Sequence, residues 1–348
     1  MFWISGGAGV VAGLAEITDW RALRWWTGQL EHVEWDGFHF WDLVFPLFLF
    51  ISGVTLPMSI ARRVERGDSR GRLYAGALRR GLLLVFLGVV YNGLFELDFA
   101  NLRYASVLGR IGLAWMLAAF VVISCGWRGE IAWIAALLLG YWAALAWIPV
   151  PGGAAGDLTP GNTLADWLDR ALLPGRLHRD VRDPEGLLST LPAVATALAG
   201  ALTGRYLLQP GRTAQRATGR KAAALALAGL ACLALGHLWG LVFPINKNLW
   251  SSSFVVWTAG WSLLLLALFY LVIDVWERRR WAFFFVVIGV NPLTIYLLQA
   301  FVDFDGVAAL VFANAADRVD LRLSPLGGLL LRWLLLYAMY RKGWFLRV

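Results

Sequence analysis

Histidine and cysteine, the side chains most used for metal binding and redox chemistry, are scarce in this 348-residue sequence. It contains four histidines and two cysteines. Cys125 and Cys232 lie in or beside apolar runs, without the short spacings of a zinc site. We interpret both as small buried hydrophobic residues. The sequence therefore predicts neither a disulfide nor a metal site.

The sequence also shows no pattern typical of an inter-domain linker, an internal repeat or a cleavable signal peptide. No Pro/Ser-rich linker or long polar tract separates the apolar runs, which predicts one domain over residues 1–348. No internal repeat stands out. The start has no basic region or small-residue cleavage site, so a removed signal peptide is a poor interpretation. Residues 1–15 would cover about 22 Å of a roughly 30 Å hydrocarbon core, so we expect half a helix here, with residues missing upstream of Met1.

Apolar residues dominate what is present. They make up 59% of the chain, with 20 Trp and 20 Phe, which excludes an ordinary soluble protein. A spanning helix needs about 20 mostly apolar residues. We predict an all-α, polytopic membrane bundle of about ten helices. Nine apolar runs look full length: 39–61, 75–95, 105–125, 130–148, 186–206, 222–243, 252–275, 281–302 and 326–340.

The net charge of +8 is explained by the positions of the charges rather than by nucleic-acid binding. One set of alternate loops holds 19 Lys or Arg and four acids, and the other holds ten and 17. This is the positive-inside pattern, and it predicts a cytoplasmic C-terminus in a plasma (inner) membrane. The arginines of loop 62–80 are assigned to anionic lipid headgroups in preference to a substrate. His32 then faces the non-cytoplasmic side.

Two outer segments differ from simple connections. Loop 149–185 is the longest outer loop and is rich in Pro and Gly at its start, which predicts a structured lid. Within it, residues 163–170 have an amphipathic helical pattern that suits the membrane surface. Residues 303–322 contain an apolar stretch too short to span, and we expect a re-entrant or interfacial element there.

Two charges fall inside predicted spans. Asp42 lies near the start of one helix and Arg110 lies within another. Charges in a hydrocarbon slab are costly, so both should face the bundle interior. They either form a structural ion pair or serve chemistry. The guanidinium of Arg110 would suit the diphosphate of a nucleotide-type cofactor.

Further polar groups gather at the predicted outer ends of helices. Asp183 and Glu185 open one helix, where they either cap its N-terminus or bind an acceptor's hydroxyl or amine. Lys247, flanked by Asn246 and close to Trp250, is either a snorkelling lysine or part of a polar and aromatic rim suited to a sugar.

Asn291 and His32 complete the candidates. Asn291 precedes Pro292 inside a predicted helix, which favours either a plain kink or a polar position lining a cavity. His32 precedes the apolar run from residue 40 and is surrounded by acids. It is either a surface histidine or a general base, because imidazole exchanges a proton near neutral pH.

Five ordered motifs together resemble one family. They are EHVEWDG at 31–37 running into FWDLVFPLFLFISG at 40–53, LGRIG at 108–112, DPEGLLST at 183–190, NKNLWSSSF at 246–254, and GVNP at 289–292. They resemble heparan-alpha-glucosaminide N-acetyltransferase and its prokaryotic relatives over nearly the whole chain. The chain lacks the basic N-terminal segment that family members usually carry before the residues matching Met1.

The resemblance implies a transferase that moves an acetyl group from cytoplasmic acetyl-CoA to an amino sugar across the membrane. It implies that His32 is the active-site base, with an acetyl-histidine as the other path, and it places Asp42 and Arg110 on family motifs. A transporter or flippase of a lipid-linked sugar, and a non-catalytic envelope scaffold, remain the alternative hypotheses. The acceptor, the acyl group and the oligomeric state, including a homodimer, are left open.

Overall fold

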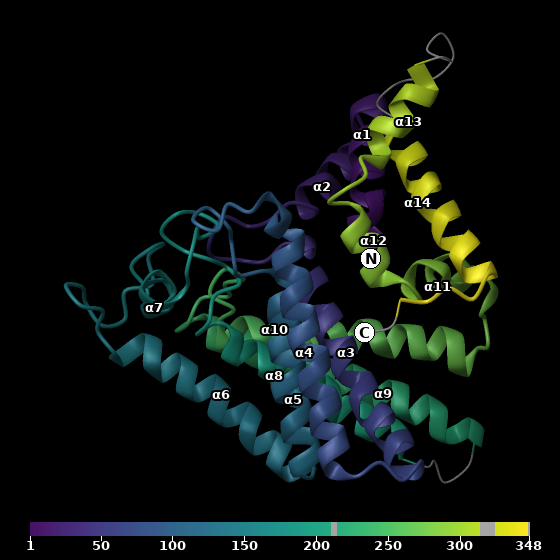
Figure 1. Ribbon diagram of the computed structural model, residues 1–348. Helices are drawn as coiled ribbons and strands as arrows, with labels where there is room; N and C mark the ends of the chain where they lie inside the picture. The colour runs from purple at the N-terminus through teal and green to yellow at the C-terminus, as the bar shows by residue number, and fades with distance from the viewer. Residues whose placement is uncertain (210–213, 314–323, 347–348) are drawn as a thin grey trace. The chain divides into compact units, whose positions relative to one another are not determined.

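Helices account for every regular element in the part of the chain that the structure describes. The computed structural model describes residues 1–209, 214–313 and 324–346. Within those ranges there is no strand, only an isolated bridge between Arg103 and Gly175. The predicted all-α class is confirmed. Figure 1 shows the order of the helices along the chain.

Seven helices are long and apolar enough to cross a membrane. The apolar part of α9 covers Gly219–Gly240, and α10 continues through a π-helical turn to Val275. Their bounds are α3 (Phe40–Glu65), α4 (Arg70–Tyr91), α5 (Val107–Ser124), α6 (Trp127–Trp147), α8 (Thr190–Leu208), α9 (Ala214–Gly240) and α10 (Ser252–Tyr270). They correspond to the first seven predicted runs.

The eighth predicted run, 281–302, is broken. α11 (Phe283–Gly289) and α12 (Pro292–Leu298) are bent by 57° at the Asn291-Pro292 step, so the predicted kink is confirmed. The ninth run forms α14 (Ser324–Arg341), which is long enough but is not apolar enough to count among the candidate spans. The described residues therefore hold seven candidate spans, or eight if the bent pair is one, slightly fewer than the predicted number of about ten.

Short polar side chains begin several of these helices. The hydroxyl of Ser106 accepts the N–H of Gly109 at the start of α5, and that of Ser251 accepts the N–H of Phe254 at the start of α10. Thr163 caps α7 (Leu164–Leu172) in the same way through Asp166. Such caps satisfy backbone donors that the first helical turn leaves open. The helix predicted at 163–170 is therefore confirmed as α7.

Packing divides the described chain into two compact units. Unit 1 contains residues 1–32, 39–41 and 277–348, and unit 2 contains residues 33–38 and 42–276. Each unit is described by itself below. The single domain over 1–348 stays a prediction.

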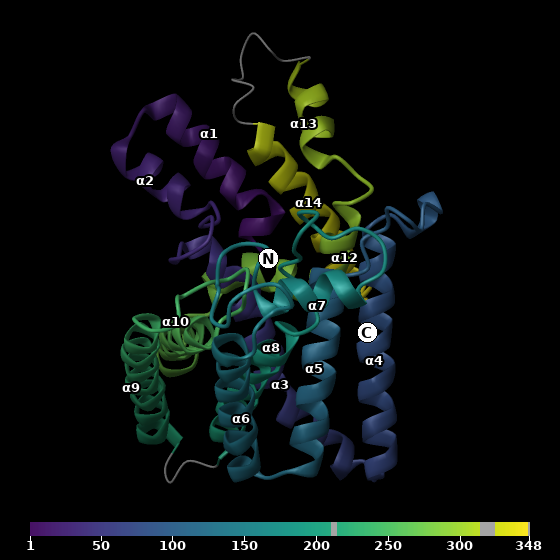
Figure 2. The same cartoon turned by 90° about the vertical axis from the view of Figure 1, so that its left-hand side faces the viewer.

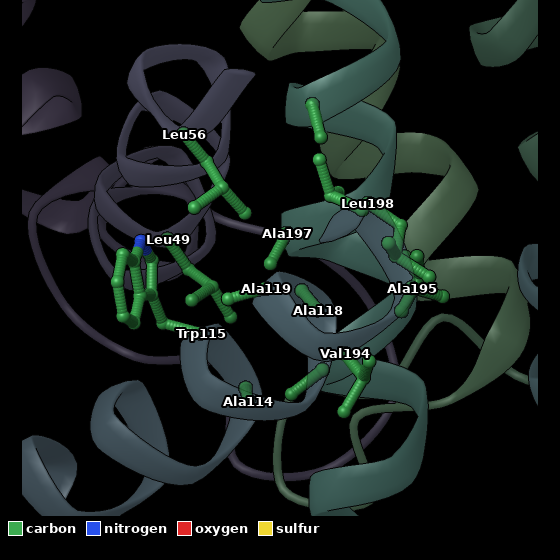
Figure 3. Packing of buried hydrophobic residues seen from close by; sticks show 14 of the residues in the cluster. Leu49, Leu56, Ala114, Trp115, Ala118, Ala119, Val194, Ala195, Ala197 and Leu198 are labelled. Carbon is green, nitrogen blue, oxygen red and sulfur yellow. The ribbon is translucent and has the colours of Figure 1, made fainter. Parts of the chain in front are cut away.

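Unit 2 is built around small side chains. In Figure 3, Leu49 and Leu56 of α3, Ala118 and Ala119 of α5 and Ala197 of α8 gather in one apolar cluster. α4, α5 and α6 stand next to one another in Figure 2, and α9 pairs with α10. Small residues let helix backbones approach closely, which is how helices without a hydrophobic driving force associate in lipid.

Unit 1 contains the N-terminal and C-terminal helices. The first segment is a distorted turn over Trp3–Gly7 followed by α1 (Ala8–Thr18), which packs on α2 (Arg21–Gln29). α13 (Phe304–Ala313) packs on α14. The predicted interfacial element at 303–322 thus begins with a short helix, and its residues 314–323 lie outside the described residues. Arg332 of α14 is buried and pairs with Asp305.

Candidate functional site

Asp42 lies at the start of α3 with its carboxylate buried in unit 2. The residue is 1% exposed. One carboxylate oxygen accepts the backbone N–H of Val33 at 3.4 Å, and the other lies 4.0 Å from Nζ of Lys247. Asp42 therefore links the backbone next to His32 with the loop between α9 and α10. The predicted interior position of Asp42 is confirmed.

The segment 33–38 is held against the loop that carries Lys247. The N–H of Gly37 donates to the carbonyl of Ile245 at 3.0 Å, and the side-chain amide of Asn248 donates to the carbonyl of Glu34 at 3.2 Å. The indole N–H of Trp35 donates to the carbonyl of Leu158 in the loop 149–185. Three segments far apart in sequence are thereby brought together at one end of unit 2.

A second charged group consists of Arg103, Asp183 and Glu185. The guanidinium of Arg103 binds the Asp183 carboxylate through two nitrogens at 2.7 and 2.6 Å, and it also contacts Glu185. Burial disfavours the charge on Arg103, but the two carboxylates outweigh this and raise its pKa. Burial alone would raise the pKa of Asp183, but the bonds from Arg103 lower it instead. Both groups are held in their charged forms.

Arg110 lies one turn inside α5 and is 1% exposed. One terminal nitrogen contacts the hydroxyl of Ser189 and the carbonyl of Gly186. Its guanidinium carbon lies 5.0 Å from the ring centroid of Trp250. Its Nε and second terminal nitrogen have no hydrogen-bond partner among the described residues. The interior position predicted for Arg110 is confirmed.

The polar face of α7 turns inward and adds two carboxylates. One Asp166 oxygen accepts the N–H of Gly161 and the hydroxyl of Thr163. Asp169 is 1% exposed and accepts the N–H of Leu187 at 2.8 Å. Burial is the main cause that raises the pKa of Asp169, to about 7, against the opposing effects of the Leu187 N–H and the charge of Arg110. Asp169 therefore changes charge near neutral pH.

Lys247 lies between the two charged groups. Its side chain is 20% exposed. Burial lowers the pKa of Lys247, while the carboxylates of Asp42 and Glu185 oppose the shift and the charge of Arg110 adds to it. The structure thus brings Asp42, Glu185 and Arg110 within electrostatic range of Lys247. An ammonium so placed can donate to a sugar hydroxyl or neutralise a nearby carboxylate.

Asn246 and Trp250 build the turn around Lys247. Asn246 is 0% exposed and its side-chain carbonyl accepts the N–H of Leu249, while Trp250 is 1% exposed and donates its indole N–H to Thr196. Both residues are buried rather than arranged along an exposed rim. Their contribution to substrate binding stays a prediction, and in this fold it would act by shaping the loop.

The remaining two candidates belong to unit 1. His32 is exposed, and its ring lies 6.1 Å from that of Trp41. Asn291 is 0% exposed, and its amide donates to the carbonyl of Trp344 and accepts the N–H of Leu346. Both polar atoms of Asn291 are used within unit 1, which favours the structural kink over a ligand contact.

Sequence reasoning missed three charged residues of this region, namely Arg103, Asp166 and Asp169. For α7 a signal was present, because Thr163 and Asp166 have the spacing of a helix cap and Asp169 follows one turn later. Arg103 gave a weaker signal as the one basic residue of loop 95–104. Among the described residues, no group of three or more His, Cys, Asp or Glu could hold a metal ion.

Comparison with known proteins confirms the sequence resemblance. The chain is 27% identical over 397 aligned positions to human heparan-alpha-glucosaminide N-acetyltransferase, covering 98% of this chain and 58% of that protein. It is 28% identical over 329 positions to the mouse protein of the same name, covering 79% and 49%. The chain thus spans about half the length of the curated relatives it matches. No family model matches the chain.

Proposed function

We propose that this chain is an integral membrane N-acetyltransferase that moves the acetyl group of acetyl-CoA to an amino sugar or related glycan. One observation carries the proposal: the buried carboxylate of Asp42 joins the backbone of Val33, directly after His32, to Lys247. The resemblance to heparan-alpha-glucosaminide N-acetyltransferase supplies the reaction class.

In the proposed reaction His32 is the general base. The acceptor amine attacks the carbonyl carbon of the thioester, the new C–N bond forms, and the C–S bond breaks to release the CoA thiolate. His32 takes the proton that the amine loses. In the alternative path His32 itself carries the acetyl group before the amine takes it. Asp42 acts as a positioning residue, because it fixes the chain next to His32.

The acceptor is proposed to meet the charged cluster around Lys247. Glu185 and Lys247 are the partly accessible charges there, with side chains 9% and 20% exposed. A carboxylate and an ammonium can bind the hydroxyls and the amine of a sugar. Asp183, Asn246 and Trp250 hold these two groups in place through the contacts described above.

The donor is proposed to enter from the opposite end of unit 2. There, one face of α3 lines a depression of about 570 Å³ that contains Arg62, Arg63 and Arg66 with the hydroxyls of Thr55 and Ser59. The sequence alone assigned these arginines to lipid headgroups, but together with the neighbouring hydroxyls they also suit the phosphates of a coenzyme, which is the role proposed here. Arg110 lies among carboxylates at the other end, so its proposed contact with the diphosphate has less support. Asn291 remains a proposed contact for acetyl-CoA, although both of its polar atoms bond within unit 1.

The proposed orientation places the basic loops and the C-terminus in the cytoplasm of a plasma (inner) membrane. The loop between α3 and α4 and the loop between α5 and α6 lie at the same end of unit 2 as the depression on α3. The charge asymmetry of the sequence supports this orientation. Acetyl-CoA would then bind from the cytoplasm and the glycan from the other side.

The test is release of free CoA thiol by the purified full chain with acetyl-CoA and glucosamine. We expect turnover that His32→Ala abolishes and that the control His178→Ala, on the loop 149–185, retains. Acetyl-CoA should also raise the unfolding temperature of the chain. Undiminished turnover by His32→Ala would remove His32 from the mechanism. No turnover and no stabilisation by acetyl-CoA would favour the transporter hypothesis instead.

A further inference from the structure

Four spanning helices end around a groove at the basic end of unit 2. The groove has a volume of about 950 Å³ and is bounded by the last turns of α3, α5 and α8 and by the first turn of α6. It lies at the end of the bundle away from Lys247, because α5 begins near Arg110 and ends at the groove. Its volume falls within the range of small-molecule sites.

The walls of this α3/α8 groove are mainly aliphatic. Val64 and Leu208 are about half exposed, so the groove is open along its side rather than enclosed. Trp127 and Tyr206 add aromatic rings near the helix ends, where aromatic side chains anchor membrane proteins at the interface. The aliphatic lining residues are Pro57, Ile60, Ala61, Val64, Val122, Leu202 and Leu208.

The guanidinium of Arg205, which lines the groove, is already bonded within the protein. Arg205 donates to Glu130 at 2.7 Å and to the carbonyls of Val122 and Cys125 at 3.1 and 3.3 Å. The guanidinium therefore closes the C-terminal end of α5 and neutralises the buried Glu130. Little polar capacity is left inside the groove, so its occupant should be apolar over most of its length.

Two cations, Arg128 and Lys221, contact or adjoin residues at the edge of the groove. The Arg128 guanidinium lies 5.2 Å from the ring centroid of Trp127. Nζ of Lys221 donates to the carbonyl of Leu207 at 2.9 Å and to that of Gln209. Glu65 is the acid that lines the groove mouth. Two cations against one acid favour a negatively charged headgroup.

We propose that the α3/α8 groove binds one anionic glycerophospholipid of the surrounding leaflet. One acyl chain lies against the aliphatic wall, and the phosphate lies at the rim near Arg128 and Lys221. The groove lies at the ends of the spanning helices. Lipid headgroups and the basic residues that flank membrane helices meet at that level, which agrees with this placement of the phosphate. The inference is independent of the proposed acetyl transfer.

Native mass spectrometry of the full chain tests the proposal, with phosphatidylglycerol and phosphatidylcholine offered at equal concentration. We expect one retained phosphatidylglycerol per chain, lost in Ala61→Trp, which fills the groove, and kept in Ala135→Trp, on an exposed position of α6. Arg128→Gln should weaken binding about fivefold, from about 1 kcal/mol per cation near a headgroup.

Three results would overturn it. One is equal retention of both lipids, and another is retention by Ala61→Trp at the wild-type level. The third is displacement of the lipid by acetyl-CoA, which would make the groove part of the donor route. If Ala61→Trp does not fold, the double variant Arg128→Gln, Lys221→Gln carries the test, with an expected loss of about 25-fold.

Discussion

Arg103 and Asp183 form a bidentate ion pair, which joins the loop before α5 to the segment that leads into α8. Their side chains are 15% and 0% exposed. The carboxylate also accepts the backbone N–H groups of His178 and Glu185. The pair therefore organises the carboxylate end of the candidate site, with Glu185 on the same guanidinium.

Removing one member of this pair should destabilise the chain. Arg103→Gln leaves the buried Asp183 charge uncompensated, which costs about 3–5 kcal/mol in comparable cases. We expect a clear loss in unfolding temperature and in turnover. The control is Arg176→Gln, an exposed arginine of the loop 149–185. Equal unfolding temperatures for both variants would show that the ion pair adds nothing to stability.

The lowered pKa of Asp183 also predicts that the folded chain loses stability at acid pH. Its pKa is lowered in the folded chain, so its contribution to stability is present above the unfolded value and is lost as the pH falls through the folded value. The window lies below about pH 4. Arg103→Gln should remove this acid-dependent loss as well as lowering stability at neutral pH.

The raised pKa of Asp169 predicts that stability changes with pH in the opposite direction, in a window at higher pH. Because its folded pKa is raised to about 7, the folded chain binds more protons than the unfolded chain between about pH 4 and pH 7. Stability should therefore fall as the pH rises through this window. Asp169→Asn keeps an acceptor for the Leu187 N–H and should flatten the profile of unfolding temperature against pH. Asp180→Asn, exposed on the same loop, should leave the profile unchanged.

Composition and periodicity were enough to find the spans, because a membrane helix is recognised from its own residues. The break at Asn291 was also predictable, since it depends on a local Pro. The ion pair of Arg103 was not, because its partner lies 80 residues away and the pairing is set by how α5 and α8 pack. Run 326–340 contains Arg332, which lowers its mean hydropathy, and the pairing of Arg332 with Asp305 is not revealed by any local pattern.

Burial of site residues was equally hidden from the sequence. Trp250 has a left-handed backbone, with φ of 51°, and this turn directs its ring into the core beneath Arg110. The sequence from Asn246 to Trp250, taken alone, indicates only a polar and aromatic loop. Which side chains turn inward depends on α3 and α8, which pack against the ring through Phe45 and Thr196.

The close approach of α3 and α8 gives a fourth prediction. A Cβ atom at Gly200 would collide with the carbonyl oxygen of Phe50, which is backbone and cannot move aside easily. Gly200→Ala should therefore cost about 1–3 kcal/mol. Gly140 on α6 is the matched control, because nothing lies within 4 Å of the position that a Cβ would take there. Gly140→Ala should be neutral or stabilise by up to about 1 kcal/mol, and an equal loss in both would contradict the packing.

Asn291 separates a structural role from a donor-binding role. Its side chain makes two hydrogen bonds to the backbone of residues 344–346, at 2.9 and 3.0 Å. Asn291→Ala removes both hydrogen bonds, so we expect a loss of about 2 kcal/mol with little change in KM for acetyl-CoA. Thr294→Val is the control, because its buried hydroxyl has no partner among the described residues. A raised KM at an unchanged unfolding temperature would instead place Asn291 on the donor.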